Sequence, residues 1–115
     1  NYRTYYEFHN VLKFGHLDFV QVDVGNIGGI TGFLRVAHLT QANNLPLCSH
    51  GMQELHVSLL SAFPNSDYLE IHSFPIDRYT EHPLKIENGF AIAPSVSGTG
   101  VSFKFDLLEP YKVNL

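Results

Sequence analysis

The fold of this sequence is decided by one stretch, FVQVDVGNIGG at residues 19–29. Residues 19–24 are rich in β-branched and aromatic side chains and run into a series of glycines, which predicts a short strand followed by a turn. A helix is expected next, with Thr31 as its N-cap and an end near Ala42, because apolar residues recur there at helical spacing. Together these segments form one strand-turn-helix unit.

The same order continues along the chain. A second strand is predicted at residues 46–49, a helix at 51–62 and a third strand at 68–71, and a helix at 5–14 precedes the first strand. Strands that alternate with helices indicate an α/β fold with parallel pairing and right-handed crossovers. After Phe74, prolines and glycines interrupt short strand-like runs, so no further βα unit is expected. We therefore predict two parts, residues 1–74 and residues 75–115.

Composition excludes several classes of protein. The 115 residues include seven Lys and Arg against eleven Asp and Glu, and 44% are hydrophobic against 16% charged, which excludes a disordered chain. No apolar run is long enough for a membrane helix, no signal peptide is expected, and the net charge of −4 offers no basic stripe for nucleic acid. The single cysteine, Cys48, excludes a disulfide framework, fits a reducing and therefore cytoplasmic location, and is expected to be a buried thiol.

Three ionisable residues lie near the ends of the three predicted strands: Asp23, His50 and Glu70. In a parallel βα barrel the carboxyl ends of the strands open onto one face, where active sites are built. An Asp beside a His fixes its tautomer and raises its basicity, which would make His50 a general base. A carboxyl group kept protonated on the next strand, Glu70, could donate a hydrogen bond to a substrate oxygen.

Each residue also has a simpler interpretation. Asp23 precedes a glycine turn and could bond only local backbone, His50 could cap a helix, and Glu70 could be a surface carboxylate. The joint pattern is what favours function. The glycines of the turn lack the spacing of a phosphate-binding loop, and His50 and His56 are too far apart in sequence to share one helical face. The remaining histidines lack ligand spacing and are expected to be surface or structural residues: His9, His16, His38, His72 and His82.

Several motifs resemble those of the enolase superfamily, in particular its mandelate racemase subgroup. They are residues 18–23, 27–31, 48–54 and 68–70, followed in the tail by Asn88-Gly89, Pro94 and residues 97–100. The resemblance implies that the chain is the C-terminal part of a modified (β/α)7β TIM-type barrel. It would hold the last three βα units and a tail that returns toward a capping domain.

The resemblance also implies a function. Enzymes of this kind use Mg²⁺ and abstract the proton α to a carboxylate, here of a small 2-hydroxy acid or sugar acid. His50 would be the base, Asp23 would orient it, and Glu70 would bind the substrate carboxylate. Dehydration is favoured over racemisation, because one His can take the proton and return it to a leaving hydroxyl. The absence of Lys from residues 24–26 disfavours the muconate cycloisomerase and dipeptide epimerase branch.

The same resemblance places important parts elsewhere. The carboxylates that hold Mg²⁺ and a second base are expected outside this chain, so no metal ligand is expected within it, and the intact protein is expected to be a homo-oligomer. The chain alone would then be inactive, with strand edges at residues 19–23 and 68–72 that favour self-association or pairing with the missing half. The alternatives are a non-catalytic structural or assembly segment and a small binding domain.

Overall fold

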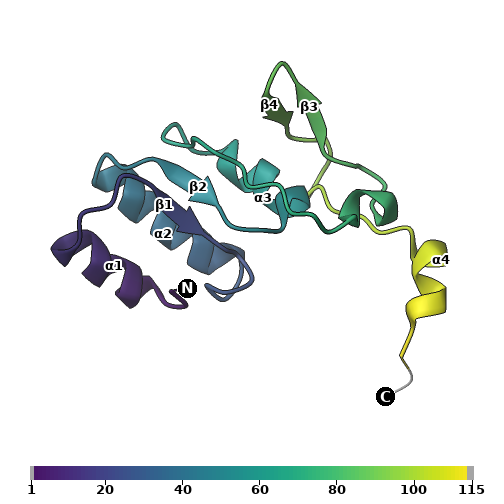
Figure 1. Cartoon of the computed structure of the whole chain (residues 1–115), viewed down its shortest axis with the longest axis horizontal. Coiled ribbons are helices and arrows are strands. Elements are labelled where there is room, and N and C mark those ends of the chain that lie inside the picture. The colour runs from purple at the N-terminus through teal and green to yellow at the C-terminus, as the bar shows by residue number, and fades with distance from the viewer. Residues whose placement is uncertain (1, 114–115) are drawn as a thin grey trace.

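Two parallel strands form the centre of the N-terminal part of the computed structural model, which describes residues 2–113 (Figure 1). Strand β1 (Val20–Val22) pairs with β2 (Leu47–Ser49) in the register Val20 to Leu47. These two strands lie where the sequence predicts them, although each is shorter than expected, and the predicted parallel pairing is confirmed. The α/β character of the chain is therefore confirmed as well.

The first helix, α1 (Tyr5–Phe14), has the predicted bounds because a capping box fixes its start. The Glu7 backbone N–H donates to Thr4 Oγ1 at 3.3 Å, and the Thr4 backbone N–H donates to Glu7 Oε2 at 2.8 Å. Each residue thus satisfies a backbone donor of the other, an arrangement that stabilises helix N-termini.

The other two long helices begin at residues that the sequence interpretation did not select. Helix α2 (Ile30–Ala42) has Gly29 as its N-cap, so the prediction of Thr31 at that position is wrong. Gly29 has a φ of 97°, which a residue with a Cβ adopts only with strain, and the glycine turn therefore sets the start of the helix. Helix α3 (Gln53–Leu60) is shorter than the predicted 51–62, because the preceding Met52 has a left-handed backbone with φ 42°.

The predicted third strand at residues 68–71 is wrong. The segment runs beside β2, and Tyr68 accepts a hydrogen bond from the Ser49 backbone N–H at 3.1 Å. Two residues later, however, the Glu70 backbone N–H donates to the hydroxyl of Ser49 at 2.9 Å, rather than to a backbone carbonyl. The backbone pairing between β2 and this part of the chain is therefore limited to one isolated parallel bridge, between Leu47 and Ser66.

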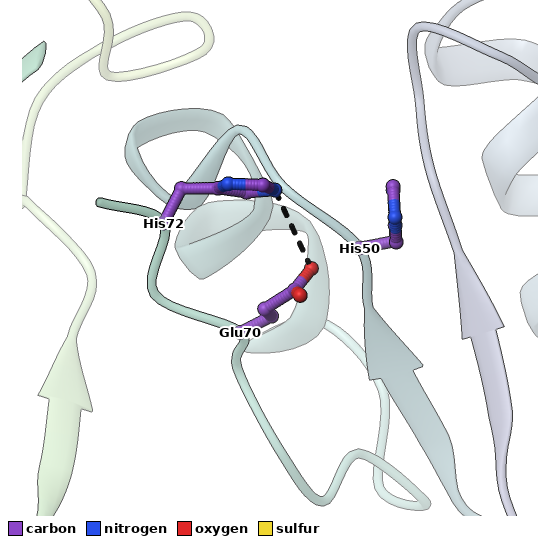
Figure 2. Close-up of side chains that lie close together, drawn as sticks. All are labelled: His50, Glu70 and His72. Atoms are coloured by element: carbon purple, nitrogen blue, oxygen red, sulfur yellow. Dashed lines mark ion pairs between the residues drawn. The ribbon is translucent and has the colours of Figure 1, made fainter. Parts of the chain in front are cut away.

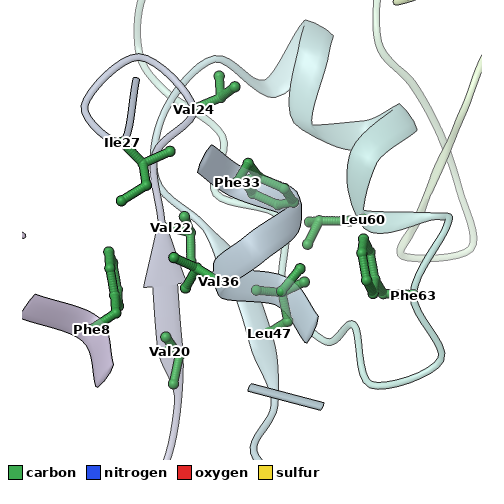
Figure 3. Packing of buried hydrophobic residues seen from close by; sticks show 11 residues of the cluster. Phe8, Val20, Val22, Val24, Ile27, Phe33, Val36, Leu47, Leu60 and Phe63 are labelled. Atoms are coloured by element: carbon green, nitrogen blue, oxygen red, sulfur yellow. The ribbon is translucent and has the colours of Figure 1, made fainter. Parts of the chain in front are cut away.

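The hydrophobic core lies between the strands and the helices (Figure 3). Helix α2 contacts both strands, α1 packs on α2, and α3 packs on β2. Phe33 and Val36 of α2 and Val22 and Leu47 of the strands have no exposed surface. This packing holds the strands in place, so it also fixes where their carboxyl ends lie.

The chain after Phe74 is irregular, as predicted, and adds no further βα unit within the described residues. It contains an antiparallel hairpin of β3 (Lys85–Glu87) and β4 (Phe90–Ile92), with Asn88 and Gly89 at the turn. The remaining elements are the 3₁₀ helix η1 (Ile76–Tyr79), helix α4 (Phe105–Leu108) and the 3₁₀ helix η2 (Glu109–Tyr111). The longest helix described, α2, has 13 residues, and no described helix is long and apolar enough to span a bilayer.

The chain exposes more surface than a compact monomer of its size. Its accessible surface is 7710 Å², whereas a monomeric protein of this mass exposes about 6,300 Å². Its radius of gyration is 15.4 Å, against about 13 Å for a compact domain of this length. Three phenylalanines on separate elements, Phe14, Phe90 and Phe105, are each more than 70% exposed. Surface of this kind favours contact with other protein.

We therefore expect the chain to self-associate. Among the described residues β1 pairs only with β2, so its other edge remains open to further pairing. Sedimentation velocity should show a mean mass that rises with concentration, and Gln21→Lys, which adds a charge to the β1 edge, should weaken that rise. Gln41→Lys on the exposed end of α2 is the matched control. A monomer at every concentration would contradict the prediction.

Candidate functional site

The loops that follow β1 and β2 bring two of the predicted site residues together. Asp23 follows β1 directly, His50 follows β2 directly, and His50 Nδ1 lies 3.1 Å from Asp23 Oδ2. The His50 backbone N–H also donates to the Val22 carbonyl at 3.1 Å, which continues the strand pairing to the start of the site. The expectation that parallel strands place these side chains at one edge is confirmed, whereas their catalytic roles stay a prediction.

The two oxygens of Asp23 have different partners. Oδ1 accepts hydrogen bonds from the backbone N–H groups of Gly25 at 2.7 Å and Asn26 at 3.3 Å, which ties the turn after β1. Oδ2 accepts from the Asn26 side chain at 2.8 Å and faces His50. Burial works against the charged form, but the hydrogen bonds from His50, Gly25 and Asn26 outweigh it and lower the pKa of Asp23. The local role and the histidine-orienting role therefore coexist in one carboxylate.

The ionised carboxylate of Asp23 determines the tautomer of His50. A carboxylate only accepts hydrogen bonds, so Nδ1 carries the proton and Nε2 keeps its lone pair. The His50 side chain is 37% exposed, against 18% for Asp23. His50 is thus a partly exposed histidine whose Nδ1 is held by a carboxylate, and proton abstraction requires a histidine held in this way.

The third predicted residue, Glu70, lies beside this pair. Its Oε2 accepts a hydrogen bond from the Gly51 backbone N–H at 2.6 Å, which joins the segment after Tyr68 to the loop after β2. His72 lies next to it, with Nε2 3.8 Å from Glu70 Oε2 (Figure 2). One potential ligand atom from each of His50, Glu70 and His72 lies within 4.8 Å of the other two.

His72 is the site residue that sequence reasoning missed. It was expected to be a surface or structural histidine, as the exposed His9, His16, His38 and His82 are, but it is half-buried and belongs to the cluster. In an extended segment, side chains two residues apart point to the same side. The two-residue spacing of Glu70 and His72 is therefore a sequence signal that both side chains lie on the same side as each other.

A hollow of about 440 Å³ opens at this cluster and is lined by Asp23, His50, His72, Phe74 and neighbouring residues. The ring of His72 stacks on Phe74, with ring centres 5.0 Å apart and planes 10° from parallel. A second hollow of about 370 Å³, lined in part by Phe19 and Gln21, also reaches Asp23 and His50. The Asp23–His50 pair therefore lines both hollows.

His56, a buried residue of α3, connects the two loops that carry this pair. Its Nε2 accepts a hydrogen bond from the Val24 backbone N–H at 3.0 Å, and its Nδ1 donates to the Gly51 carbonyl at 2.6 Å. Val24 adjoins Asp23, and Gly51 adjoins His50. Burial is the main cause that lowers the pKa of His56, so the neutral ring that both bonds require is the stable form.

This network predicts a loss of stability in mild acid. Because the pKa of His56 is lower in the folded state, the unfolded chain binds more protons below about pH 6.5, the ordinary histidine pKa. The free energy of unfolding should be fully retained above that pH and should fall below it, by up to about 1.4 kcal/mol per pH unit. Urea unfolding at about pH 7.5 and about pH 5.5 measures the difference.

His56→Gln should lower the stability at both pH values and remove most of this pH dependence. His16→Gln, at an exposed histidine, should leave it unchanged. An equal pH dependence in the wild type and in His56→Gln would show that His56 is not its source.

Cys48 is a free thiol and only 2% exposed, as predicted. Burial raises the pKa of this thiol, which keeps it protonated and therefore a poor nucleophile. It packs next to the site and takes no part in its chemistry.

Residues 1–107 match the enolase C-terminal domain-like family. The chain belongs to that family. It is 41% identical over 108 residues to 3,6-anhydro-alpha-L-galactonate cycloisomerase from Streptomyces coelicolor, a match that covers 94% of this chain and 30% of that enzyme. The resemblance to the enolase superfamily, inferred from the sequence, is confirmed.

Solved structures of family members have the same fold. A racemase from Streptomyces coelicolor A3(2), with bound magnesium, matches with a TM-score of 0.87 and 39% identity over 96% of this chain and 30% of that one. L-talarate dehydratase from Polaromonas sp. JS666, complexed with Mg and L-glucarate, matches with a TM-score of 0.85 and 25% identity over 94% of this chain and 30% of that one. The chain thus spans about 30% of the length of these relatives.

The described part of the chain does not fit magnesium. Among residues 2–113, the one group of three close potential ligands is His50, Glu70 and His72, which offers two imidazole nitrogens and one carboxylate. Mg²⁺ prefers an octahedron of oxygen ligands and binds imidazole poorly. The expectation that the magnesium ligands of the intact protein lie outside this chain stays a prediction.

Proposed function

We propose that this chain supplies the base and its orienting carboxylate to an enzyme that removes the proton α to the carboxylate of a sugar acid. The observation that carries the proposal is the Asp23–His50 pair, in which Asp23 holds Nδ1, leaves the lone pair on Nε2, and lines a hollow together with His50. The family supports it, because the relatives include a sugar-acid cycloisomerase, a sugar-acid dehydratase and a racemase.

In the first proposed step His50 Nε2 takes the proton from the carbon next to the substrate carboxylate. The electron pair of the broken C–H bond moves into the carboxylate and gives an enediolate. The ring then carries a proton on both nitrogens, and the negative charge of Asp23 stabilises it. The lowered pKa of Asp23 keeps that charge present across the neutral range.

Glu70 is proposed to bind the substrate carboxylate. Its Oε2 is held by the Gly51 backbone N–H, so Oε1 is the atom available to a substrate. With a proton on Oε1, Glu70 would donate a hydrogen bond that strengthens as negative charge builds on the enediolate.

Dehydration follows from the same histidine. The protonated ring returns its proton to the hydroxyl on the next carbon, the C–O bond breaks, and water leaves as the enediolate electrons form a carbon–carbon double bond. The resulting enol gives a 2-keto-3-deoxy acid. One histidine therefore suffices, whereas racemisation needs a second base on the opposite face of the same carbon.

The proposal assigns this chain only part of an active site, because it spans about 30% of its relatives. Magnesium, when bound in the intact protein, would supply charge stabilisation to the enediolate. The specificity for one sugar acid is proposed to depend on parts of the relatives that this chain does not cover.

The test uses a hybrid enzyme. Residues 1–107 replace the matching segment of the Streptomyces coelicolor cycloisomerase, and NMR follows the magnesium-dependent exchange of the α-proton for deuterium over a panel of sugar acids. We expect exchange, and we expect His50→Asn to reduce its rate by about 10²–10⁴-fold. His82→Asn makes the same change at an exposed histidine and should have no effect.

The fold of each hybrid is checked by its thermal melt and circular dichroism. A folded hybrid whose exchange rate is the same with His50→Asn would contradict the proposal. That result would favour the alternative, a segment that serves structure or assembly without taking part in the chemistry.

A further inference from the structure

We propose that His50, Glu70 and His72 form a binding site for a divalent transition-metal ion of the zinc class. Figure 2 shows His72 and Glu70 reaching toward one another, with the ring of His50 standing beside them at the end of β2. Two imidazoles and one carboxylate on one side of an ion form a known type of metal site that leaves positions open for water or another ligand.

The distances allow such a site after small side-chain movements. The three potential ligand atoms lie within 4.8 Å of one another, and His72 Nε2 is 3.8 Å from Glu70 Oε2. Bonds of about 2.0–2.2 Å to a tetrahedral ion place its ligand atoms about 3.3 Å apart. The side chains of His72 and Glu70 are 31% and 36% exposed. Side-chain rotations that move their ligand atoms by about an ångström can therefore bring these atoms to the required spacing without moving the core.

A second observation points to a ligand at His50. Metal-binding histidines commonly donate their other ring N–H to a carboxylate, which fixes the tautomer and directs the remaining lone pair at the ion. Asp23 Oδ2 occupies that position on Nδ1 of His50, at 3.1 Å.

The other two ligands are also held by outer contacts. The Gly51 backbone N–H donates to Oε2 of Glu70 and fixes the carboxylate, whose oxygens keep further lone pairs for the ion. The His72 ring is stacked on Phe74 and packs against Gly51, where an added Cβ would lie 3.2 Å from the ring.

The ligand types decide which ions fit. Imidazole nitrogens favour Zn²⁺, Co²⁺ and Ni²⁺, whereas Mg²⁺ favours oxygen ligands. The site is therefore distinct in chemistry from the magnesium that the solved relatives contain. Its formation does not depend on the proposed function. If that function also holds, a bound ion would occupy Nε2 of His50 and inhibit proton abstraction.

The chain itself, as a folded sample, is titrated with Co²⁺ while visible absorption reports ligand-field bands. We expect saturable binding of one ion per chain, displacement by Zn²⁺ and no displacement by Mg²⁺. His72→Ala removes a ligand and Asp23→Asn weakens the support of His50, so each should weaken binding by about 10–100-fold or more. His82→Ala, at an exposed histidine, should bind as the wild type does.

A check of the fold and a second ligand variant distinguish loss of the metal site from loss of the fold. Near-ultraviolet circular dichroism shows that each variant retains the wild-type fold, and Glu70→Gln serves as a second ligand variant. Equal Co²⁺ affinity in the wild type and in folded His72→Ala and Glu70→Gln would overturn the proposal. Equal competition by Mg²⁺, or one ion shared between two chains, would overturn it too.

The hybrid enzyme separates this proposal from the proposed function. Exchange is measured in the hybrid with magnesium and without cobalt, and cobalt binding is measured on the chain alone. Cobalt binding by the chain, together with no exchange in the cobalt-free hybrid, would reject the function and keep the metal site. Exchange without cobalt binding would reject the metal site and keep the function.

Discussion

The parallel pairing of β1 with β2 is the constraint on which the rest of the site depends. Two parallel strands end at the same edge, so the residue after each strand faces the same region of space. Asp23 and His50 occupy those two positions, and the bond from the His50 N–H to the Val22 carbonyl continues the pairing up to them. Helix α2 packs across both strands and stabilises this register, with Phe33 and Val36 fully buried against them.

Beyond the strands, side chains replace backbone pairing. The Ser49 hydroxyl accepts from Glu70, Glu70 accepts from Gly51, and His56 bridges Val24 and Gly51. Each bond satisfies a backbone group that the two paired strands leave unpaired, and each places a polar side chain near the strand ends. The interruption of the third strand and the assembly of the candidate site are therefore two results of the same hydrogen bonds.

Both proposals rest on the lone pair of His50 Nε2, which the Asp23 carboxylate leaves free. A proton or a metal ion can use that lone pair, but not both at once. The outcome depends on what faces the histidine, and that includes His72, whose ring lies with its centre 6.0 Å from the centre of the His50 ring. Phe14, Phe90 and Phe105 expose apolar surface of the kind that contact with further protein would cover.

The sequence by itself determined the order of the helices and strands from α1 to α3, the parallel pairing and the meeting of Asp23 with His50. These follow from local signals, because hydrophobic spacing sets helices and strands and alternation of the two sets parallel pairing. Family membership was also accessible, since its motifs are short and contiguous.

Only the tertiary structure decided the rest. It placed the N-cap of α2 at Gly29, bonded the segment predicted as a third strand to the Ser49 hydroxyl instead of a backbone carbonyl, and brought His56 and His72 into the site. Each of these depends on contacts between residues far apart in sequence or on the backbone angles of a turn. A single histidine in a sequence carries no sign of which carbonyl, ring or carboxylate the fold will place beside it.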